Sequence, residues 1–305
     1  MNELTIVSSH KAFKDCSLNE SICFSYKNIK IQLSYNNQQL HILLKSRKKR
    51  KKTVMIFHEL FNLLFLILGG FPEIKCASWN AEPFHISDLD KYNTSIHFLN
   101  SNFQIADIST SNINEETLSK LDAIYKKPLY SIQYLVCKQY EKVITDHKTA
   151  LLMHTVDGFV NRYEKVYIEN VKLALDPFFK YHRKHNCGIL KALNTTSKKL
   201  CETIRDTRHA TSHFSDKDLI LEDGEPYSIY FFLLYFSLRA FLLENIIKIK
   251  LSEEKIRECL YVYHDWIVEI KKRKAPFKSI TYKLVSFQKD MYEITRHISA
   301  ENPIE

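Results

Sequence analysis

The chain has few of the residues that interrupt regular structure, since its 305 residues include 5 Gly and 7 Pro. Disordered chains are rich in such residues and poor in apolar ones, whereas 45% of this chain is hydrophobic. Its seven cysteines, at positions 16, 23, 76, 137, 187, 201 and 259, form no Cys-x-x-Cys pair. These shortages argue against disorder and predict a compact protein whose thiols stay reduced in the cytoplasm.

Several signatures of known chemistry and of membrane targeting are also absent. The sequence has no GxGxxG, P-loop, HExxH or nucleophile-elbow motif, so nucleotide-binding and hydrolase folds receive little support. Residues 1–20 lack a basic segment followed by an apolar core, so we expect no secretory signal there. Val54–Phe71 and Ile229–Ile247 are apolar, but Glu59 interrupts the first and Arg239 the second. We therefore expect buried helices and no membrane span.

Positive charge is concentrated in one short run. The formal net charge is +9, and residues 45–52 supply seven of these charges, which leaves two for the rest of the chain. A polyanion partner is therefore expected at one place. Candidate contacts to RNA phosphates are Lys45, Arg47, Lys48, Lys49, Arg50, Lys51 and Lys52. A solvated loop between a hairpin and a helix explains the run equally well.

The fold class predicted from the sequence is α+β, with a mixed α/β domain over residues 1–112 and helices after it. Tyr35–Gln38 is a plausible hairpin connection, because Asn is common in tight turns. Short runs rich in β-branched and aromatic residues predict strands at Ser21–Tyr26, Ile29–Tyr35, Gln39–Lys45, Glu73–Trp79 and Thr94–Leu99.

From about Asn114 the apolar period becomes helical, which predicts an all-α domain over residues 113–276 and an extension over residues 277–305. Asn114 and the two acidic residues after it are typical of a helix start. Asn194–Ser197 offers N-caps to a helix that ends near Ser215. Two further helices are expected at Ala150–Glu164 and at Tyr163–Leu175, the second ending just before Pro177, and a polar break is expected at His182–Asn186. A long apolar helix is expected at Tyr227–Lys250. The last helix is expected to start at the caps Leu251–Glu254 and to end at Lys271–Lys274.

The helix that follows Asn194–Ser197 carries Arg208 and, five residues later, His213. A guanidinium can hold a phosphate while an imidazole moves protons near neutral pH, which suits phosphodiester cleavage without a metal. Five helical residues turn about 140°, so the two side chains do not share a face of one straight helix. Two copies of the helix about a two-fold axis could place both pairs around one groove, so the spacing predicts a dimer.

With a polar residue straight after the arginine, Arg208-x4-His213 resembles the signature of the HEPN superfamily of ribonucleases. The motif comes late on one helix, before a loop and a long apolar helix, and Leu151–Tyr261 is similar to the four-helix plan of that family. A mixed α/β domain before these helices resembles the ApeA-like branch, which is found in bacterial antiphage defence.

The resemblance implies a metal-independent endoribonuclease that needs no cofactor and acts at a composite site in a HEPN homodimer. His213 would be the general acid or base for attack of the RNA 2′-hydroxyl on the adjacent phosphate, and Arg208 would bind that phosphate. The products would carry 2′,3′-cyclic phosphate and 5′-hydroxyl ends. His209 stands where the family more often has Asn or Asp and is a third candidate catalytic residue, which would orient the site. Arg205 is a further candidate RNA contact. The N-terminal domain would recognise a trigger or the substrate in a toxin-like, abortive-infection role.

A non-catalytic interpretation stays open beside this one. Arg205 and Arg208 can be solvated helix residues, and His213 can be a cation favoured at a helix C-terminus. The chain would then be an RNA-binding or dimerisation module.

Three further features have alternatives of their own. His182-x-x-His185-x-Cys187 has zinc-binding atoms but no fourth ligand nearby, so we expect no metal site. The aromatic residues between Tyr227 and Phe236 could stack on bases, but their density favours a core or a dimer interface. Asp157 could orient the motif or could be solvated.

Overall fold

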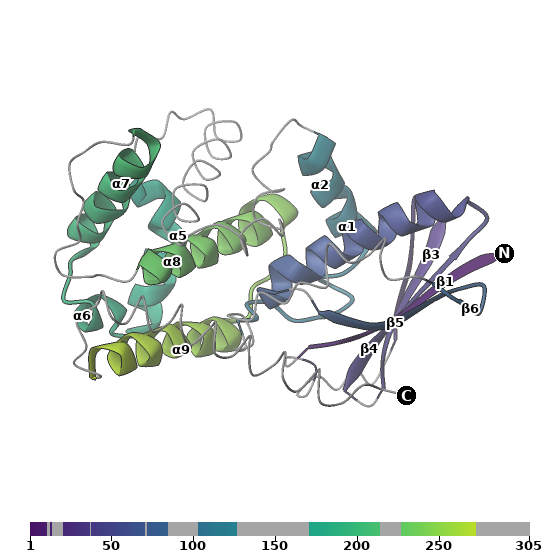
Figure 1. Cartoon of the computed structure of the whole chain (residues 1–305), viewed down its shortest axis with the longest axis horizontal. Coiled ribbons are helices and arrows are strands. Elements are labelled where there is room, and N and C mark those ends of the chain that lie inside the picture. The colour runs from purple at the N-terminus through teal and green to yellow at the C-terminus, as the bar shows by residue number, and fades with distance from the viewer. Residues whose placement is uncertain are drawn as a thin grey trace, which may run out of the picture.

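The computed structural model of the chain describes residues 1–10, 13, 21–36, 38–70, 72–84, 103–126, 171–213 and 227–272. It shows an α+β protein, as the sequence predicts: an antiparallel sheet with a long helix across it lies at one end, and helices gather at the other (Figure 1). One continuous cluster of buried apolar side chains runs through both ends.

The sheet has six strands in the order β2-β3-β4-β1-β5-β6, and neighbouring strands are antiparallel. Residues alternate between buried and accessible along β3 and β4, because successive side chains of a strand point to opposite faces. The strands are β1 (Asn2–Ser9), β2 (Ile22–Tyr26), β3 (Ile29–Asn36), β4 (Gln39–Ser46), β5 (Glu73–Trp79) and β6 (Glu82–Pro83).

Four of the strands expected from the sequence are confirmed within a residue or two, whereas Thr94–Leu99 lies outside the described residues. The hairpin turn is also confirmed, since Asn36 pairs with Gln39 and Gln38 has a left-handed φ of 62°. Strand β1 was not among the expected strands, although it pairs with both β4 and β5 in the middle of the sheet.

Helix α1 (Arg50–Leu68) crosses the buried face of the sheet (Figure 1). It begins inside the basic run, earlier than the expected start at Val54, so the run is not a free loop throughout its length. Most of its apolar residues are buried, as predicted, and Glu59 accepts hydrogen bonds from Lys27 Nζ at 2.9 and 3.0 Å. None of the helices that the structure describes combines the length and hydropathy needed to cross a membrane.

The helix ends at Gly69, whose N–H donates to Phe65 O at 2.8 Å in a left-handed backbone conformation with a φ of 82°. Glycine adopts this conformation without the cost that a Cβ atom brings. A Cβ atom at Gly69 would also lie 2.6 Å from Arg239 Nη1 and 2.8 Å from Phe103 Cβ. The end of α1 therefore has no room for a larger residue.

We expect Gly69→Ala to lower the free energy of unfolding by about 1–3 kcal/mol, because it combines a left-handed alanine with a steric clash. Urea unfolding measures this change. Gly188→Ala is the matched control, since Gly188 has a φ of 68° but its nearest neighbour would be His264 at 3.4 Å. Equal losses for the two variants would show that the clash with Arg239 has no energetic effect.

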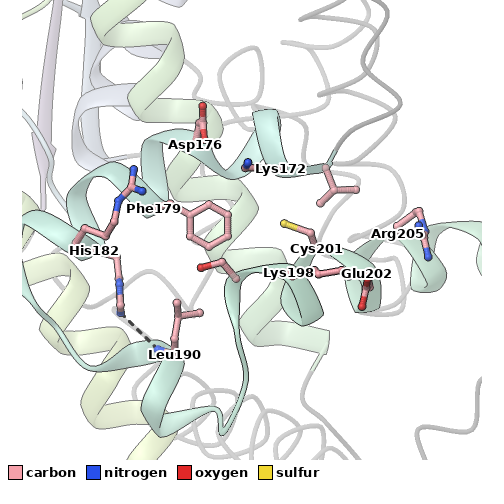
Figure 2. A pocket seen from close by; sticks show the side chains of 12 residues that line it. Lys172, Asp176, Phe179, His182, Leu190, Lys198, Cys201, Glu202 and Arg205 are labelled. Carbon is pink, nitrogen blue, oxygen red and sulfur yellow. Dashed lines mark hydrogen bonds and ion pairs between the residues drawn. The ribbon is translucent and has the colours of Figure 1, made fainter.

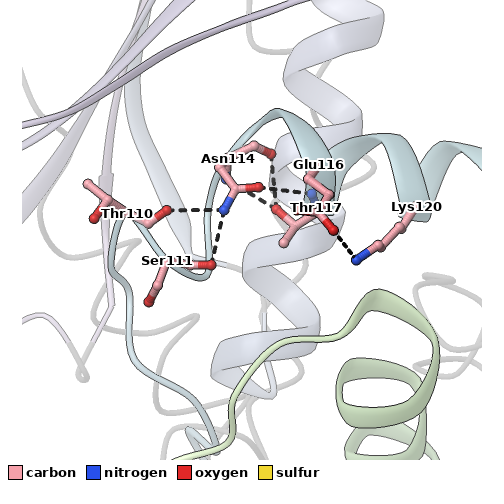
Figure 3. Close-up of polar contacts among 6 residues, drawn as sticks. All are labelled: Thr110, Ser111, Asn114, Glu116, Thr117 and Lys120. Carbon is pink, nitrogen blue, oxygen red and sulfur yellow. Dashed lines mark hydrogen bonds and ion pairs between the residues drawn. The ribbon is translucent and has the colours of Figure 1, made fainter.

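Helix α2 (Glu115–Lys126) begins where the sequence predicts, immediately after Asn114 (Figure 3). Asn114 Oδ1 accepts a hydrogen bond from the Thr117 N–H at 3.0 Å, and Asn114 Nδ2 donates to the carbonyl oxygens of Thr110 and Ser111. The acceptor bond satisfies one of the amides that a helix start leaves without a helical partner.

Asn114→Ala should lower the free energy of unfolding by about 1 kcal/mol, because it removes this N-cap. Asn114→Ser keeps an acceptor oxygen for the Thr117 N–H, although it loses the two bonds of Nδ2, and should recover part of that loss. Thermal or urea unfolding of the two variants tests the assignment, and an alanine variant as stable as the serine variant would contradict it.

Helix α5 (Val171–His185) contains Pro177, so the expected helix end before this proline is wrong. A proline inside a helix disrupts local backbone bonding. Here the next amide, Phe178 N–H, donates to the Ser237 hydroxyl of the neighbouring helix at 3.0 Å, in a buried environment. The helix also continues through most of the polar break predicted at His182–Asn186. It ends at His185, and left-handed residues follow at Asn186 and Gly188.

The apolar stretch from Tyr227 forms α8 (Tyr227–Phe241) and continues into a π-helical turn, η6 (Leu242–Ile247), which ends at left-handed Lys248. The remaining helices of this end are α6 (Ile189–Ala192), α7 (Ser197–His213) and α9 (Glu253–Lys272). Helix α5 packs against α7, α8 and α9. The predicted starts of α7 and α9 are confirmed, and of the expected aromatic core, Tyr230, Phe232, Tyr235 and Phe236 are buried.

Arg239, which the sequence presents as a charge interrupting an apolar segment, is fully buried in the structure. Its guanidinium donates to Leu66 O at 2.9 Å, Ile67 O at 3.0 Å and Phe103 O at 3.1 Å. The neighbouring Tyr235 hydroxyl donates to Gly69 O at 3.3 Å. These hydrogen bonds connect helix α8 to the end of α1, so they join residues on both sides of the domain boundary expected at residue 112. The boundary itself stays a prediction.

Candidate functional site

Helix α7 carries the Arg-x4-His motif in its last turns, and its start is well defined. Thr196 Oγ1 accepts a hydrogen bond from the Lys199 N–H at 3.2 Å, so Thr196 is the N-cap within the predicted Asn194–Ser197 segment. Leu200 and Ile204 are buried and attach the helix to the core. The helix then continues without interruption to His213.

Arg208, His209 and His213 all lie on this helix, whereas their side chains lie outside the described residues. Helical geometry separates Arg208 from His213 by about 140° around the axis and about 7.5 Å along it. The observed helix therefore retains the property that suggested a dimer, namely that the two residues do not share one face.

Arg205 lies one turn before Arg208 on α7. Its side chain is exposed, and Nε and Nη2 donate to Asp206 Oδ1 at 3.0 and 2.9 Å. An exposed ion pair between neighbours contributes little to stability and is readily exchanged for another anion. Arg205 is therefore accessible to a phosphate next to the motif.

A pocket with a volume of about 520 Å³ lies between α5 and the first half of α7 (Figure 2). Phe179 from α5 and Cys201 from α7 point toward each other across it, and Leu190 closes it from α6. The cationic residues Lys172, Lys198 and Arg205 also line the pocket, and Arg205 lies at its edge, farther along α7 than Cys201. The pocket has no signature in the sequence, because its residues come from three helices and form no motif.

Two titratable groups inside the pocket are held neutral by burial. Burial lowers the pKa of His182, whose Nε2 accepts a hydrogen bond from the Leu190 N–H at 3.4 Å. Burial also raises the pKa of the Cys201 thiol, against the effect of nearby Lys172. The charge in the pocket therefore comes from its lysines, arginines and carboxylates.

The residues considered for zinc have separate protein contacts. His182 contacts Leu190, and His185 Nε2 lies 2.9 Å from Glu253 Oε2, while Cys187 is buried. Within the described part of the chain, no three His, Cys, Asp or Glu side chains lie together as metal ligands would. Asp157 lies outside the described residues.

The basic run spans the end of β4 and the first turn of α1, far along the molecule from α7 (Figure 1). Three of its members have intramolecular contacts: Lys45 with Glu3 at 3.2 Å, Lys48 with Lys27 O, and the Arg50 guanidinium with the Phe84 ring at 4.1 Å. The exposed members Arg47, Lys49, Lys51 and Lys52 are the better candidates for phosphate contacts.

Replacing Arg47, Lys49, Lys51 and Lys52 by serine should flatten the salt dependence of RNA binding. Each lost phosphate contact lowers the slope of log K against log salt by about 0.7 for a single strand. Binding titrations at several salt concentrations measure the slope. Replacing Lys180 and Lys184, which pair with Glu244 and Glu253, should leave it unchanged. Equal slopes for the quadruple variant and the wild type would show that the run is only a solvated surface.

The chain was compared with models of protein families, with curated proteins and with solved structures. It matches none of them. The candidate site is therefore defined by the geometry of α7 and its neighbours alone.

Proposed function

We propose that the chain is a metal-independent endoribonuclease of the HEPN type, with Arg208 and His213 as its catalytic residues. The 2′-oxygen of RNA attacks the adjacent phosphorus, His213 takes or returns a proton, and the bond to the 5′-oxygen breaks. Arg208 binds the phosphate and stabilises the charge that develops on it. The products are a 2′,3′-cyclic phosphate and a 5′-hydroxyl, and His209 assists as a third polar residue.

The observation that carries this proposal is the position of the motif in the fold. Arg208 and His213 occupy the last turns of α7, and the next described element is the apolar helix α8. Helix α5 packs against both of these helices. This order supports the four-helix HEPN arrangement that the sequence resembles.

The 140° separation of Arg208 and His213 supports a site built from two copies of α7. We propose a homodimer in which the helical ends meet and the sheet end, with its basic run, binds the RNA or a trigger. The resemblance implies that the protein acts in abortive-infection defence, in the cytoplasm.

Incubation of the purified full-length chain with total RNA in EDTA tests this function. The expected result is fragments that carry cyclic-phosphate ends, which a phosphatase removes only after acid opens the ring. RNA that stays intact over a range of protein concentrations, although it binds the chain, would instead assign the protein as a non-catalytic RNA-binding module.

A further inference from the structure

The pocket between α5 and α7 is large enough for one small organic group and is built like a ligand site. Its volume of about 520 Å³ falls within the usual range of ligand pockets, about 300–1,000 Å³. Its centre is apolar, formed by Val171, Phe179, Leu190 and Cys201. A bare inorganic anion would leave most of this apolar surface without a contact, so the pocket suits a ligand that has an apolar part.

Cationic side chains exceed carboxylates around this centre. Lys172, Arg183, Lys198 and Arg205 line the pocket together with Asp176 and Glu202. Burial lowers the pKa of His182 and raises that of Cys201, so neither adds charge at neutral pH. A ligand with one flat, hydrogen-bonding part and one anionic part fits this distribution, because the carboxylates can accept its amino or hydroxyl protons.

The positions of Lys198, Cys201 and Arg205 connect the pocket with the catalytic motif. These residues are spaced by three and four positions, so they form one stripe along α7. The stripe continues toward Arg208 and His209. Around the helix axis, Arg208 lies about 60° to one side of Arg205 and His209 about 40° to the other. From Cys201 to Arg208 the helix rises by about 10 Å, a distance that a few linked nucleotides can span.

We propose that the pocket holds one nucleotide of a single-stranded RNA whose scissile phosphate lies at Arg208. The base enters the apolar centre between Phe179 and Cys201, and its phosphate contacts Lys198 and Arg205. Proteins commonly bind single strands in this way: the bases contact aromatic and apolar side chains, and the phosphates contact basic residues. The position of this subsite on the RNA rests on the proposed function, whereas nucleotide binding in the pocket does not.

The test measures binding of a fluorescent pentanucleotide of 2′-O-methyl RNA to the full-length protein by fluorescence anisotropy. This ligand has no 2′-hydroxyl and so cannot be cut by the proposed reaction. We expect Lys198→Gln to weaken binding about fivefold, while its neighbour Lys199→Gln, which changes charge equally but does not line the pocket, changes it less than about twofold. Cys201→Tyr, which places a ring in the apolar centre where the base is proposed to lie, should weaken binding about fivefold or more, and Cys201→Ser should not.

Equal effects of Lys198→Gln and Lys199→Gln would overturn the proposal. If Cys201→Tyr proves unfolded by circular dichroism, the lysine pair alone decides the outcome. A free nucleoside monophosphate that competes as well as the pentanucleotide would overturn the assignment to an RNA strand. Cleavage of total RNA distinguishes the two proposals. If the chain does not cleave RNA but shows the expected binding differences, the nucleotide pocket is supported and the ribonuclease function is not. If the chain cleaves RNA without these binding differences, only the ribonuclease function is supported.

Discussion

His213→Ala and Arg208→Ala should each lower the rate of RNA cleavage by about 10²–10⁴-fold. In the proposed reaction, His213 transfers the proton that the attacking 2′-hydroxyl loses or the leaving 5′-oxygen gains, and alanine offers no replacement. The same proposal gives Arg208 the role of stabilising charge on the phosphate in the transition state, which a neutral side chain would not do. Both changes lie in the last turns of α7, after the buried residues Leu200 and Ile204. Initial rates on a defined RNA, with circular dichroism spectra, measure both effects.

Two residues on α9 provide matched controls for these variants. Arg257 is exposed and His264 is half-buried beside Asp265, and neither lines the pocket or belongs to the motif. Arg257→Ala and His264→Ala should keep the wild-type rate within about twofold. If Arg208→Ala and His213→Ala cleave RNA as fast as these controls do, the catalytic assignment is wrong. The proposed composite site adds a second criterion, since the rate per chain should fall when dilution dissociates the proposed dimer.

Arg239→Met should lower the free energy of unfolding by about 3–5 kcal/mol, the largest stability effect that we expect of one side chain here. Methionine fills a similar elongated space but donates no hydrogen bond. The carbonyl oxygens of Leu66, Ile67 and Phe103 would each lose a charged donor in a buried environment. Urea unfolding followed by circular dichroism measures the change.

Arg257→Met is the control for this substitution, because it makes the same chemical change on an exposed position of α9. Its free energy of unfolding should stay within about 0.5 kcal/mol of the wild-type value. Arg239→Lys should fall between the two, since one ammonium group keeps the charge but cannot reproduce the fork of the guanidinium. An Arg239→Met protein as stable as the control would show that the buried bonds do not hold α8 to α1.

Local chemistry explains which parts of the fold could be predicted from the sequence. The strands from Ile22 to Ser46 alternate in residue type with a period of two, and their partners are close in sequence. Asn114 and Thr196 cap α2 and α7 through side chains that reach amides three residues on. Each of these features depends on residues within one turn or one hairpin.

The features that the sequence did not show depend on partners far along the chain. Pro177 stays inside α5 because the following amide binds the Ser237 hydroxyl, 59 residues later. Arg239 is buried because carbonyl groups from the end of α1 accept its hydrogen bonds. Neither pattern has a local signature, so the proline was expected to end a helix, and the sequence showed Arg239 only as a charge that interrupts an apolar segment.

For the candidate site, the sequence predicted which helix carries Arg208 and His213 but not what lies beside it. The structure places both on α7, as expected, and sets Arg205 next to a pocket that Phe179 and Cys201 share. These residues are separated by more than 20 positions and come together only because α5 packs on α7. The basic run, by contrast, could be located but not divided into paired and exposed members.

The start of α1 has a consequence for the energetics of binding at the sheet end. The helix opens with Arg50, Lys51 and Lys52, has no acidic residue in its first turn, and has no side-chain cap at Lys49. Positive charges beside the positive end of a helix repel it and one another, so the unliganded helix start is less stable than an acidic one would be. A polyanion bound there would relieve this repulsion, so its binding and the order of the first turn would be thermodynamically coupled.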